Sequence, residues 1–211
     1  MILLMFLSMA IAETLVAYKA QIHLHLNGPT FAGRLDGEII LSEENFRVSI
    51  VGPSGSDMAV FIGVNSQISG ALLAEGIIFP EVESGELIKA ISQEQFTELD
   101  IQTVFLGQWP CENEGVECRE KNNRPRLVNL GKEPVLSIQY PNYKVIKNVE
   151  LPSRIRVEIP PIDWKLRFNM KHWSVVPYDA SYFNADYPEA EVYQDLVTMV
   201  KEMLKNVKGP K

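Results

Sequence analysis

The sequence predicts a mainly β protein of the α+β class, built on a curved antiparallel sheet. Apolar and polar residues alternate in five segments, the pattern of a strand with one buried and one solvated face. Turn-forming residues separate these segments, at 27–29, 52–55 and 160–161. Helical spacing occurs in two stretches, 84–107 and 189–211. A sheet with one apolar face must curl around its own side chains or be covered by such helices.

In each predicted strand the apolar residues occupy every second position, and polar residues such as Lys165 and Arg167 fill the positions between them. These apolar residues are expected to share the buried face of the sheet. They are Tyr18, Ala20, Ile22, Leu24 and Leu26; Phe46, Val48 and Ile50; Leu136, Ile138 and Tyr140; Ile155, Val157 and Ile159; and Trp164, Leu166, Phe168 and Met170.

The segment 84–107 predicts two short helices. Ser84 can cap the first, and Thr97 with Asp100 three residues later resembles a capping box for the second, which Gly107 ends. Each helix is too short to be stable alone, so its apolar side chains must rest on the sheet, as a lid or a plug. These side chains are Leu87, Ile88 and Ile91 in the first helix and Ile101, Val104 and Phe105 in the second.

Residues 189–211 predict an amphipathic helix that follows the main domain, residues 13–188. We expect this helix to dock on the domain; a helix that binds a partner or a membrane surface is the alternative. Its apolar residues recur at steps of three and four and are Val192, Leu196, Met199, Val200, Met203, Leu204 and Val207.

The first twelve residues predict a signal peptide, because they are uncharged, almost wholly apolar and end in Ala10-Ile11-Ala12. A basic leading segment is missing, and an ordinary buried N-terminal segment is the alternative. Twelve residues are too few to span a membrane as a helix. A bacterial lipoprotein needs Cys after the cleavage point, where this chain has Glu13. As numbered, the chain is therefore expected to be exported without a lipid anchor.

The two cysteines, Cys111 and Cys118, are expected to form a disulfide. Six residues separate them in a polar loop, which is too wide a spacing for a zinc knuckle, and there is no second pair. Two free surface thiols are the alternative. A disulfide here implies an oxidising compartment.

Charge and motifs argue against nucleic-acid binding and catalysis. The chain has 20 Lys and Arg against 27 Asp and Glu, a net charge of -7 that repels a phosphate backbone. No nucleophile elbow, phosphate loop, dinucleotide fingerprint or zinc-protease motif is present. His23 and His25 share a strand face and could hold a metal with an acidic neighbour, but Lys19 and Gln21 on that face favour a solvated surface. We expect neither enzyme activity nor a metal or other cofactor.

The order of motifs resembles the LolB-like proteins, which are outer-membrane receptors of Gram-negative bacteria for lipoproteins delivered by the soluble carrier LolA. The resemblance starts at Gly33-Arg34-Leu35 in an early strand and continues with residues 46–55, a strand that ends in a Gly-Pro-x-Gly turn. Residues 87–107 are similar to the helical segment of the family, and residues 151–155 and 165–173 to its closing strands.

This resemblance implies an incomplete β-barrel closed by helices, which holds the acyl chains of lipoproteins or other lipids in an apolar interior. It implies a location in the periplasm, also at the inner face of the outer membrane, and a LolA-like carrier or an envelope complex as partner. The implied lid consists of Leu87, Ile88 and Ile101. The implied cavity lining consists of Leu24, Ile50, Trp164, Leu166, Phe168 and Met170.

Two features depart from the family. In the family, the turn equivalent to Pro53-Ser54-Gly55 offers an exposed leucine, whereas this chain has Ser54 at that position. The family receptor is also anchored by a lipid on a cysteine, whereas this chain has Glu13 at the expected position. Both departures favour a soluble carrier, or a non-catalytic structural subunit that uses the same fold to join an envelope assembly.

Overall fold

The computed structural model describes residues 15–29, 32–91, 101–131, 133–184, 187 and 192–207. The predicted signal peptide (1–12) and the predicted capping box of Thr97 and Asp100 lie outside these residues.

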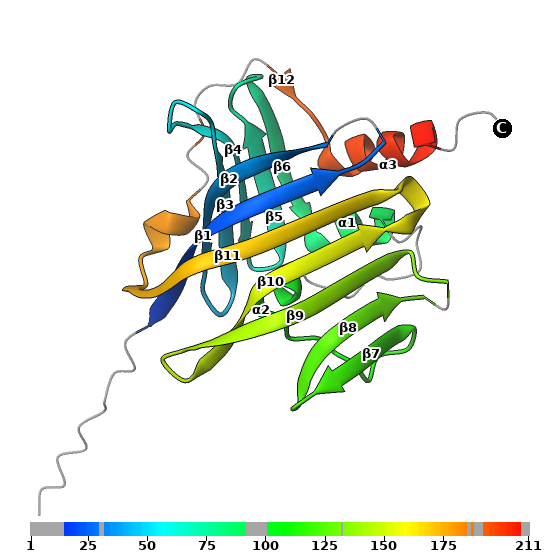
Figure 1. Ribbon diagram of the computed structural model, residues 1–211. Helices are drawn as coiled ribbons and strands as arrows, with labels where there is room; N and C mark the ends of the chain where they lie inside the picture. Colours follow the sequence, from blue (N-terminus) through cyan, green and yellow to red (C-terminus); the bar gives the residue numbers. More distant parts are fainter. Residues whose placement is uncertain are drawn as a thin grey trace, which may run out of the picture.

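The described residues form a 12-stranded sheet, three α-helices and two short 3-10 helices (Figure 1). The first strands are β1 (Val16–Asn27), β2 (Ala32–Leu41), β3 (Asn45–Val51), β4 (Asp57–Val64), β5 (Gln67–Leu72) and β6 (Ile77–Glu83). The later strands are β7 (Val116–Lys121), β8 (Arg124–Leu130), β9 (Leu136–Ile146), β10 (Val149–Ile159), β11 (Trp164–Pro177) and β12 (Val192–Tyr193). The helices are α1 (Ser84–Ile91), α2 (Ile101–Leu106), α3 (Leu196–Val207), η1 (Pro160–Ile162) and η2 (Ala180–Phe183).

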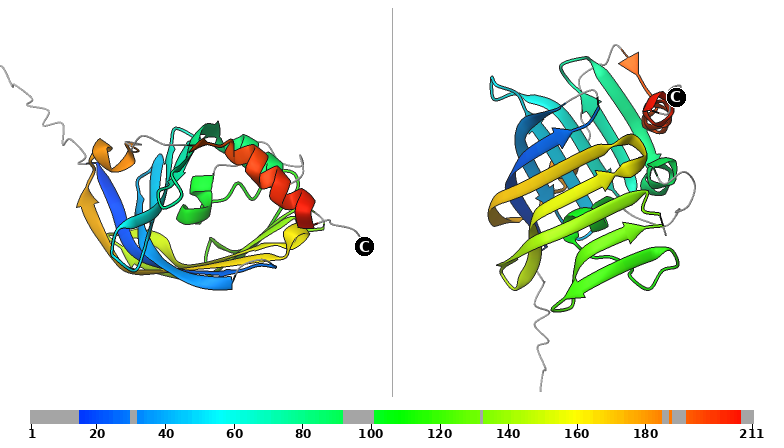
Figure 2. Two further views of the ribbon diagram at one scale, coloured as in Figure 1. Left: turned by 90° about the horizontal axis from the view of Figure 1, so that it is seen from above. Right: turned by 45° about the vertical axis from the view of Figure 1, so that its right-hand side comes forward.

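The sheet runs in the order β12-β6-β5-β4-β3-β2-β1-β11-β10-β9-β8-β7. All pairings are antiparallel except that of β12 with β6, as the turn signals predict for strands joined by short connections. The first strand therefore lies inside the sheet, between β2 and β11. Seen from above, the sheet curls into an unclosed barrel with α2 inside the curve and α3 along the open side (Figure 2). The expected fold class, an incomplete barrel with covering helices, is confirmed.

Alternation along the strands sorts side chains between the two faces. The concave face carries the main apolar cluster, to which β1 contributes Ala20, Ile22 and Leu24. A smaller second cluster lies on the other face, where Phe183 of η2 packs with Ile40 and neighbouring apolar side chains. Both faces of the first strands are thus covered by apolar contacts, which favours burial of these strands in the middle of the sheet.

A bulge in β11 keeps the alternation in phase. Lys19 pairs with Ser174 and Gln21 with Lys171, so Ala20 stands opposite two residues, His172 and Trp173. His172 has φ of 54°, a left-handed conformation that histidine adopts more readily than most residues. Because of the extra residue, Trp173 returns to the concave face, where it is 8% exposed.

The three α-helices begin and end near the predicted positions, with one correction. Helix α1 begins at Ser84, and Gly107 with φ of 64° follows the end of α2. The expected C-terminal helix is too long at its start: Val192 lies in β12, and α3 begins at Leu196. Asp195 explains this boundary, since its carboxylate accepts hydrogen bonds from the backbone N–H groups of Val197 (3.1 Å) and Thr198 (3.3 Å). Among the described residues, no helix has the length and apolar character needed to cross a membrane.

Candidate functional site

The concave face brings three predicted lining residues, Leu24, Leu166 and Phe168, together with further apolar side chains of adjacent strands. Leu24 of β1 stands beside Phe168 of β11, which stands beside Ile155 of β10. One step along, Leu26 stands beside Leu166. All five side chains belong to one apolar cluster or pack against it. Strands far apart in sequence thus build one continuous apolar surface.

The remaining predicted lining residues differ in their burial. Met170 and Ile50 are buried in the same cluster, with 5% and 6% of their surface exposed. Trp164 is not part of this cluster. It covers the backbone of Gly28, where an added Cβ would lie 2.6 Å from the indole. Trp164 therefore closes a hairpin end of the sheet, while the other residues face its interior.

Helix α1 supplies two of the three predicted lid residues. Leu87 and Ile88 are buried in the main cluster, and Ile101 at the start of α2 packs against it. Helices α1 and α3 contact one another, and Leu196 at the start of α3 is 6% exposed within the same cluster. The C-terminal helix therefore docks on the open side of the barrel, as expected.

Helix α2 places an aromatic side chain inside the curve of the sheet. Phe105 is 7% exposed, and its ring centroid lies 5.6 Å from that of Phe46 and 5.7 Å from that of Phe168. The contact with Phe168 is edge-on, a favourable geometry for aromatic pairs. The space between sheet and helices is thus occupied by the protein's own α2.

A buried glutamine holds the first turn of α2. Gln102 is 5% exposed, and its amide Nε2 donates to the carbonyl oxygen of Ser42 at 3.0 Å and also to that of Glu43. Both acceptors lie between β2 and β3. Gln102 was missed by the sequence analysis, although a glutamine among the apolar side chains of a short helix is the signal that could have revealed it.

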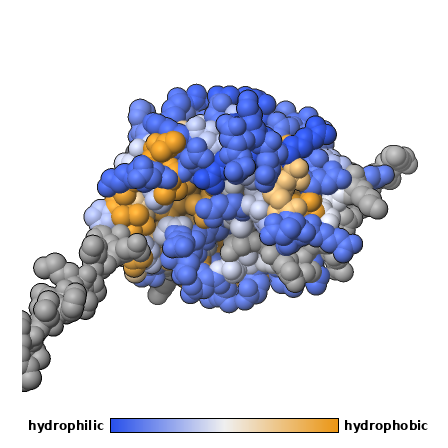
Figure 3. Space-filling view, turned by 90° about the horizontal axis from the view of Figure 1, so that it is seen from below, coloured by the Kyte–Doolittle hydropathy of each residue, from blue (hydrophilic) through white to orange (hydrophobic). Residues whose placement is uncertain are grey.

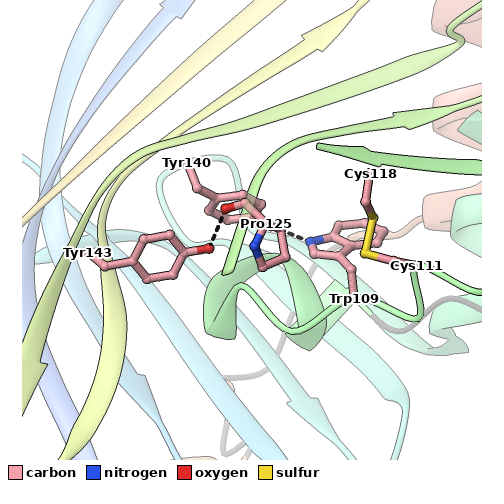
Figure 4. Close-up of a disulfide and its surroundings, with 6 residues drawn as sticks. All are labelled: Trp109, Cys111, Cys118, Pro125, Tyr140 and Tyr143. Carbon is pink, nitrogen blue, oxygen red and sulfur yellow. Dashed lines mark hydrogen bonds between the residues drawn. A yellow bond between two sulfur atoms is a disulfide. The ribbon is translucent and has the colours of Figure 1, made fainter. Parts of the chain in front are cut away.

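A buried tyrosine holds the other end of α2 (Figure 4). Tyr140 of β9 accepts a hydrogen bond from Trp109 Nε1 at 2.6 Å and donates one to the carbonyl oxygen of Val104 at 2.9 Å. Burial raises the pKa of Tyr140 well above its ordinary value, so the phenol keeps its proton. The sequence pattern places Tyr140 on the inner face but carries no signal for its two partners.

The predicted disulfide between Cys111 and Cys118 is present, with the two Cα atoms 5.6 Å apart. Cys118 belongs to the edge strand β7, and Cys111 lies two residues beyond Trp109. Figure 4 shows the disulfide beside the indole of Trp109. It therefore ties the connection that leaves α2 to the edge of the sheet.

The predicted exposed loop is the turn between β3 and β4. Pro53, Ser54 and Gly55 are all exposed, and the N–H of Gly55 donates to the carbonyl oxygen of Gly52 at 2.9 Å. The hydroxyl groups of Ser54 and Ser56 lie 2.8 Å apart. The tip of this loop thus presents hydroxyl groups in place of an apolar side chain.

The two histidines of β1 lie on the outer face of the sheet. His23 Nδ1 lies 2.5 Å from Asp36 Oδ1 and 3.0 Å from Arg34 Nη2. The hydrogen bond with His23, followed by the Arg34 charge, lowers the pKa of Asp36 from its ordinary value. Within the described residues, no three His, Cys, Asp or Glu side chains are grouped so that they could hold a metal.

Comparisons with known proteins identify the fold. Neither a family model nor a curated protein matches this sequence. Solved structures with a similar fold include a DUF1329 family protein from Desulfovibrio piger, with a TM-score of 0.52 and 12% identity over 82% of this chain and 91% of that one. A LolA superfamily protein from Nitrosomonas europaea has a TM-score of 0.50 and 11% identity, over 82% of this chain and 91% of that one. A domain described as a putative outer membrane lipoprotein-sorting protein from Vibrio parahaemolyticus has a TM-score of 0.53 and 10% identity, over 80% of this chain and 89% of that one. At these identities the likeness shows the fold alone, which is LolA-like.

Proposed function

We propose that this protein binds the acyl chains of lipids or lipoproteins in the interior between the concave face and helices α1, α2 and α3. The observation that carries the proposal is the continuous apolar surface formed by Leu24, Phe168 and Ile155 beneath the ring of Phe105. Two of the solved structures with this fold are named for the LolA superfamily and for lipoprotein sorting, which supports the same reading.

The energetics of acyl burial suit such an interior. Each buried methylene contributes about 0.8 kcal/mol, so one chain contributes roughly 10 kcal/mol before ordering costs. The ring of Phe105 must leave the interior before a chain can enter, because its contacts with Phe46 and Phe168 fill that space. An acyl chain that takes the place of the Phe105 ring makes apolar contacts of its own, so its entry is favourable when ligand is present.

Helix α2 has the attachments expected of a removable plug. It has only six residues; Gln102 holds its first turn, and the Val104 carbonyl accepts a hydrogen bond from the sheet near its other end. A short helix of this kind has little stability of its own. Seen from below, apolar side chains are recessed between hydrophilic ones (Figure 3).

A role as a periplasmic carrier fits the chain better than a role as a membrane-inserting receptor of the LolB type. The turn between β3 and β4 presents Ser54, whose hydroxyl lies 2.8 Å from that of Ser56, so its tip gains nothing from entering lipid. The disulfide between Cys111 and Cys118 is suited to an oxidising compartment. Transfer to a LolA-like or other envelope partner then requires only that the acceptor bind the acyl chain more tightly.

Native mass spectrometry after mild purification tests the proposal, with acyl-lipid adducts as the expected result. Phe168→Arg places a charge on the inner face and should abolish the adducts, whereas Gln21→Arg on the exposed outer side of β1 should retain them. Phe105→Ala removes the inserted ring and should increase uptake of a fluorescent fatty acid. Absence of lipid from both the wild type and Phe105→Ala, with the fold intact by circular dichroism, overturns acyl binding.

A structural subunit of an envelope assembly is the second candidate, and the filled interior favours it. Phe105 is 7% exposed and closely surrounded by aromatic rings, as in an ordinary core. Exposed apolar side chains lie on the edge strand β12, where Val192 and Tyr193 are 43% and 68% exposed. On this reading Phe105→Ala only destabilises the protein, by about 3–5 kcal/mol, and no fatty acid binds.

A further inference from the structure

The outer face of the sheet carries a row of basic side chains across four adjacent strands. Arg34 of β2 pairs in register with His25 of β1, His25 with Arg167 of β11, and Arg167 with Arg156 of β10. Side chains directly opposite one another on antiparallel strands lie close together, and like charges in such positions are destabilising. This arrangement therefore costs stability in a chain whose net charge is -7.

The acidic residues of this face compensate only one end of the row. Asp36 lies 3.3 Å from Arg34, and Glu158 stands opposite Lys165 one position beyond the row. Neither Arg156 nor Arg167 has an ion-pair partner among the residues that the structure describes. Two adjacent guanidinium groups are thus left without an ion-pair partner, although Glu158 lines the depression beside them.

Arg156 also has an unsatisfied buried donor. Its Nε is buried and has no hydrogen-bond partner, whereas Arg154 on the same strand donates from Nε to Asn169 Oδ1 at 2.9 Å. A buried donor without an acceptor is costly, and a charged one more so. An oxyanion beside Arg156 and Arg167 relieves the repulsion, and a turn of the Arg156 side chain toward it also gives Nε an acceptor.

The surface at the row is hollowed on both sides. A depression of about 440 Å³ adjoins Arg34, Arg154 and Arg167, and a second of about 360 Å³ adjoins Arg156 and Arg167. Asn142, Ser153 and Asn169 add polar groups to the first depression, and Lys171 adds a further cation. The row therefore offers positive charge together with hydrogen-bond donors in a concave setting, which is the chemistry that recognises phosphate.

We propose that the row formed by Arg34, His25, Arg167 and Arg156 binds a phosphate-type oxyanion, separately from the apolar interior. Arg167 and Arg156 provide the central guanidinium donors, and Arg154 and Lys171 flank them. The oxyanion is either a free phosphate group or the phosphate of a lipid headgroup, since both present the same oxygens to this face.

A titration with inorganic phosphate and with pyrophosphate tests this site, against chloride at equal ionic strength. Amide resonances of β10 and β11 should shift in a saturable way, and the melting temperature should rise with phosphate. Arg156→Gln/Arg167→Gln should weaken binding about tenfold or more because two charge-assisted contacts are lost. It should also melt at a higher temperature than the wild type in low salt without phosphate, which shows that it folds.

The matched control is Arg119→Gln/Lys121→Gln, which removes the same charge from exposed positions on β7, three strands beyond β10. This variant should bind phosphate like the wild type.

Flotation with phosphatidylglycerol vesicles, against phosphatidylcholine vesicles, identifies the source of the oxyanion. Vesicle binding that Arg156→Gln/Arg167→Gln abolishes indicates a lipid headgroup. Phosphate binding without flotation indicates a free phosphate. The site is refuted if neither phosphate nor phosphatidylglycerol binds saturably, or if both double variants lose binding equally.

Discussion

Trp109 and Tyr140 are joined by a hydrogen bond of 2.6 Å from the indole Nε1 to the phenol oxygen. The same phenol donates to the carbonyl oxygen of Val104 in α2, so one buried side chain of β9 connects the inserted helix to the chain that follows it. Figure 4 shows Trp109 and Tyr140 beside the disulfide. Tyr140 is therefore one of the side chains that attach α2 to the sheet, and it can be changed without altering the helix itself.

Tyr140→Phe should loosen α2. The substitution leaves the Trp109 indole N–H and the Val104 carbonyl without their partner, at a cost of about 1–3 kcal/mol in the free energy of unfolding. Urea denaturation gives the loss, and hydrogen exchange of the α2 amides shows where it occurs. Tyr143→Phe is the control, because the Tyr143 hydroxyl donates to the carbonyl oxygen of Pro125 in β8 at 2.8 Å, so its loss removes a partly buried hydrogen bond that does not involve α2. Equal exchange rates in both variants would contradict an anchoring role for Tyr140.

Gly107→Ala should destabilise the end of α2 through a steric clash as well as through backbone strain. A Cβ on Gly107 would lie 2.8 Å from Tyr143 Oη and 3.0 Å from Pro152 Cγ. Gly76→Ala isolates the strain, since Gly76 has the same φ of 64° and no atom within 4 Å of an added Cβ. We expect Gly107→Ala to cost at least about 1 kcal/mol more than Gly76→Ala in urea denaturation. Equal costs would show that the neighbours yield without penalty.

Alkaline pH should weaken the fold through Tyr143. Burial raises the pKa of Tyr143 to about 12 from an ordinary value of 10.0. The folded state therefore holds this proton more tightly than the unfolded chain, and the resulting stability is complete below pH 10 and disappears as the pH rises to about 12. Denaturation midpoints of the wild type and Tyr143→Phe between pH 9 and pH 12 should show a smaller decline for the variant. Parallel curves would contradict this assignment.

Acid should release the start of α3 through Asp195. Its hydrogen bond with the Thr198 hydroxyl, assisted by the N–H groups of Val197 and Thr198, lowers the pKa of the carboxyl from its ordinary value of 3.8. This stability is present above the ordinary pKa and is lost as the pH falls through the lowered folded value. Amide exchange in the first turn of α3 should accelerate below about pH 4 in the wild type. Asp195→Asn still caps the helix but does not titrate, so its exchange should lack this acid step.

Reduction of the disulfide should destabilise the protein by about 2–3 kcal/mol, because the closed loop between Cys111 and Cys118 is short. The unfolding midpoint with and without a reductant measures the loss. Cys111→Ser/Cys118→Ser should match the reduced wild type and show no further response to the reductant. A continued response of this variant would indicate an effect of the reductant elsewhere.

Part of the candidate site could be predicted because the period of two along a strand is a local property. Alternation places Leu24, Leu166 and Phe168 on the inner face and His25 and Arg167 on the outer face, and the structure has them there. Gly107 marks the end of α2 for a local reason as well, since glycine adopts its φ with less strain than other residues.

Other features depended on which segments become neighbours. Val192 fits the helical spacing of residues 196–207, yet it lies in a strand because its segment pairs with Ile77 of β6 and Asp195 caps the helix three residues later. Trp164 fits the alternation of β11, yet it covers Gly28 at a hairpin end and does not join the main cluster. In both cases a partner distant in sequence decides the outcome.

The sequence by itself determined the fold class, the two faces of each strand, the short helices and the disulfide, because alternation, capping residues and cysteine spacing act over a few residues. Only the tertiary structure decided that Phe105 fills the interior, that Tyr140 holds α2 and that Arg156 stands opposite Arg167. These relationships depend on strand order and register, which arise from hydrogen bonds and packing between distant segments that local patterns do not specify.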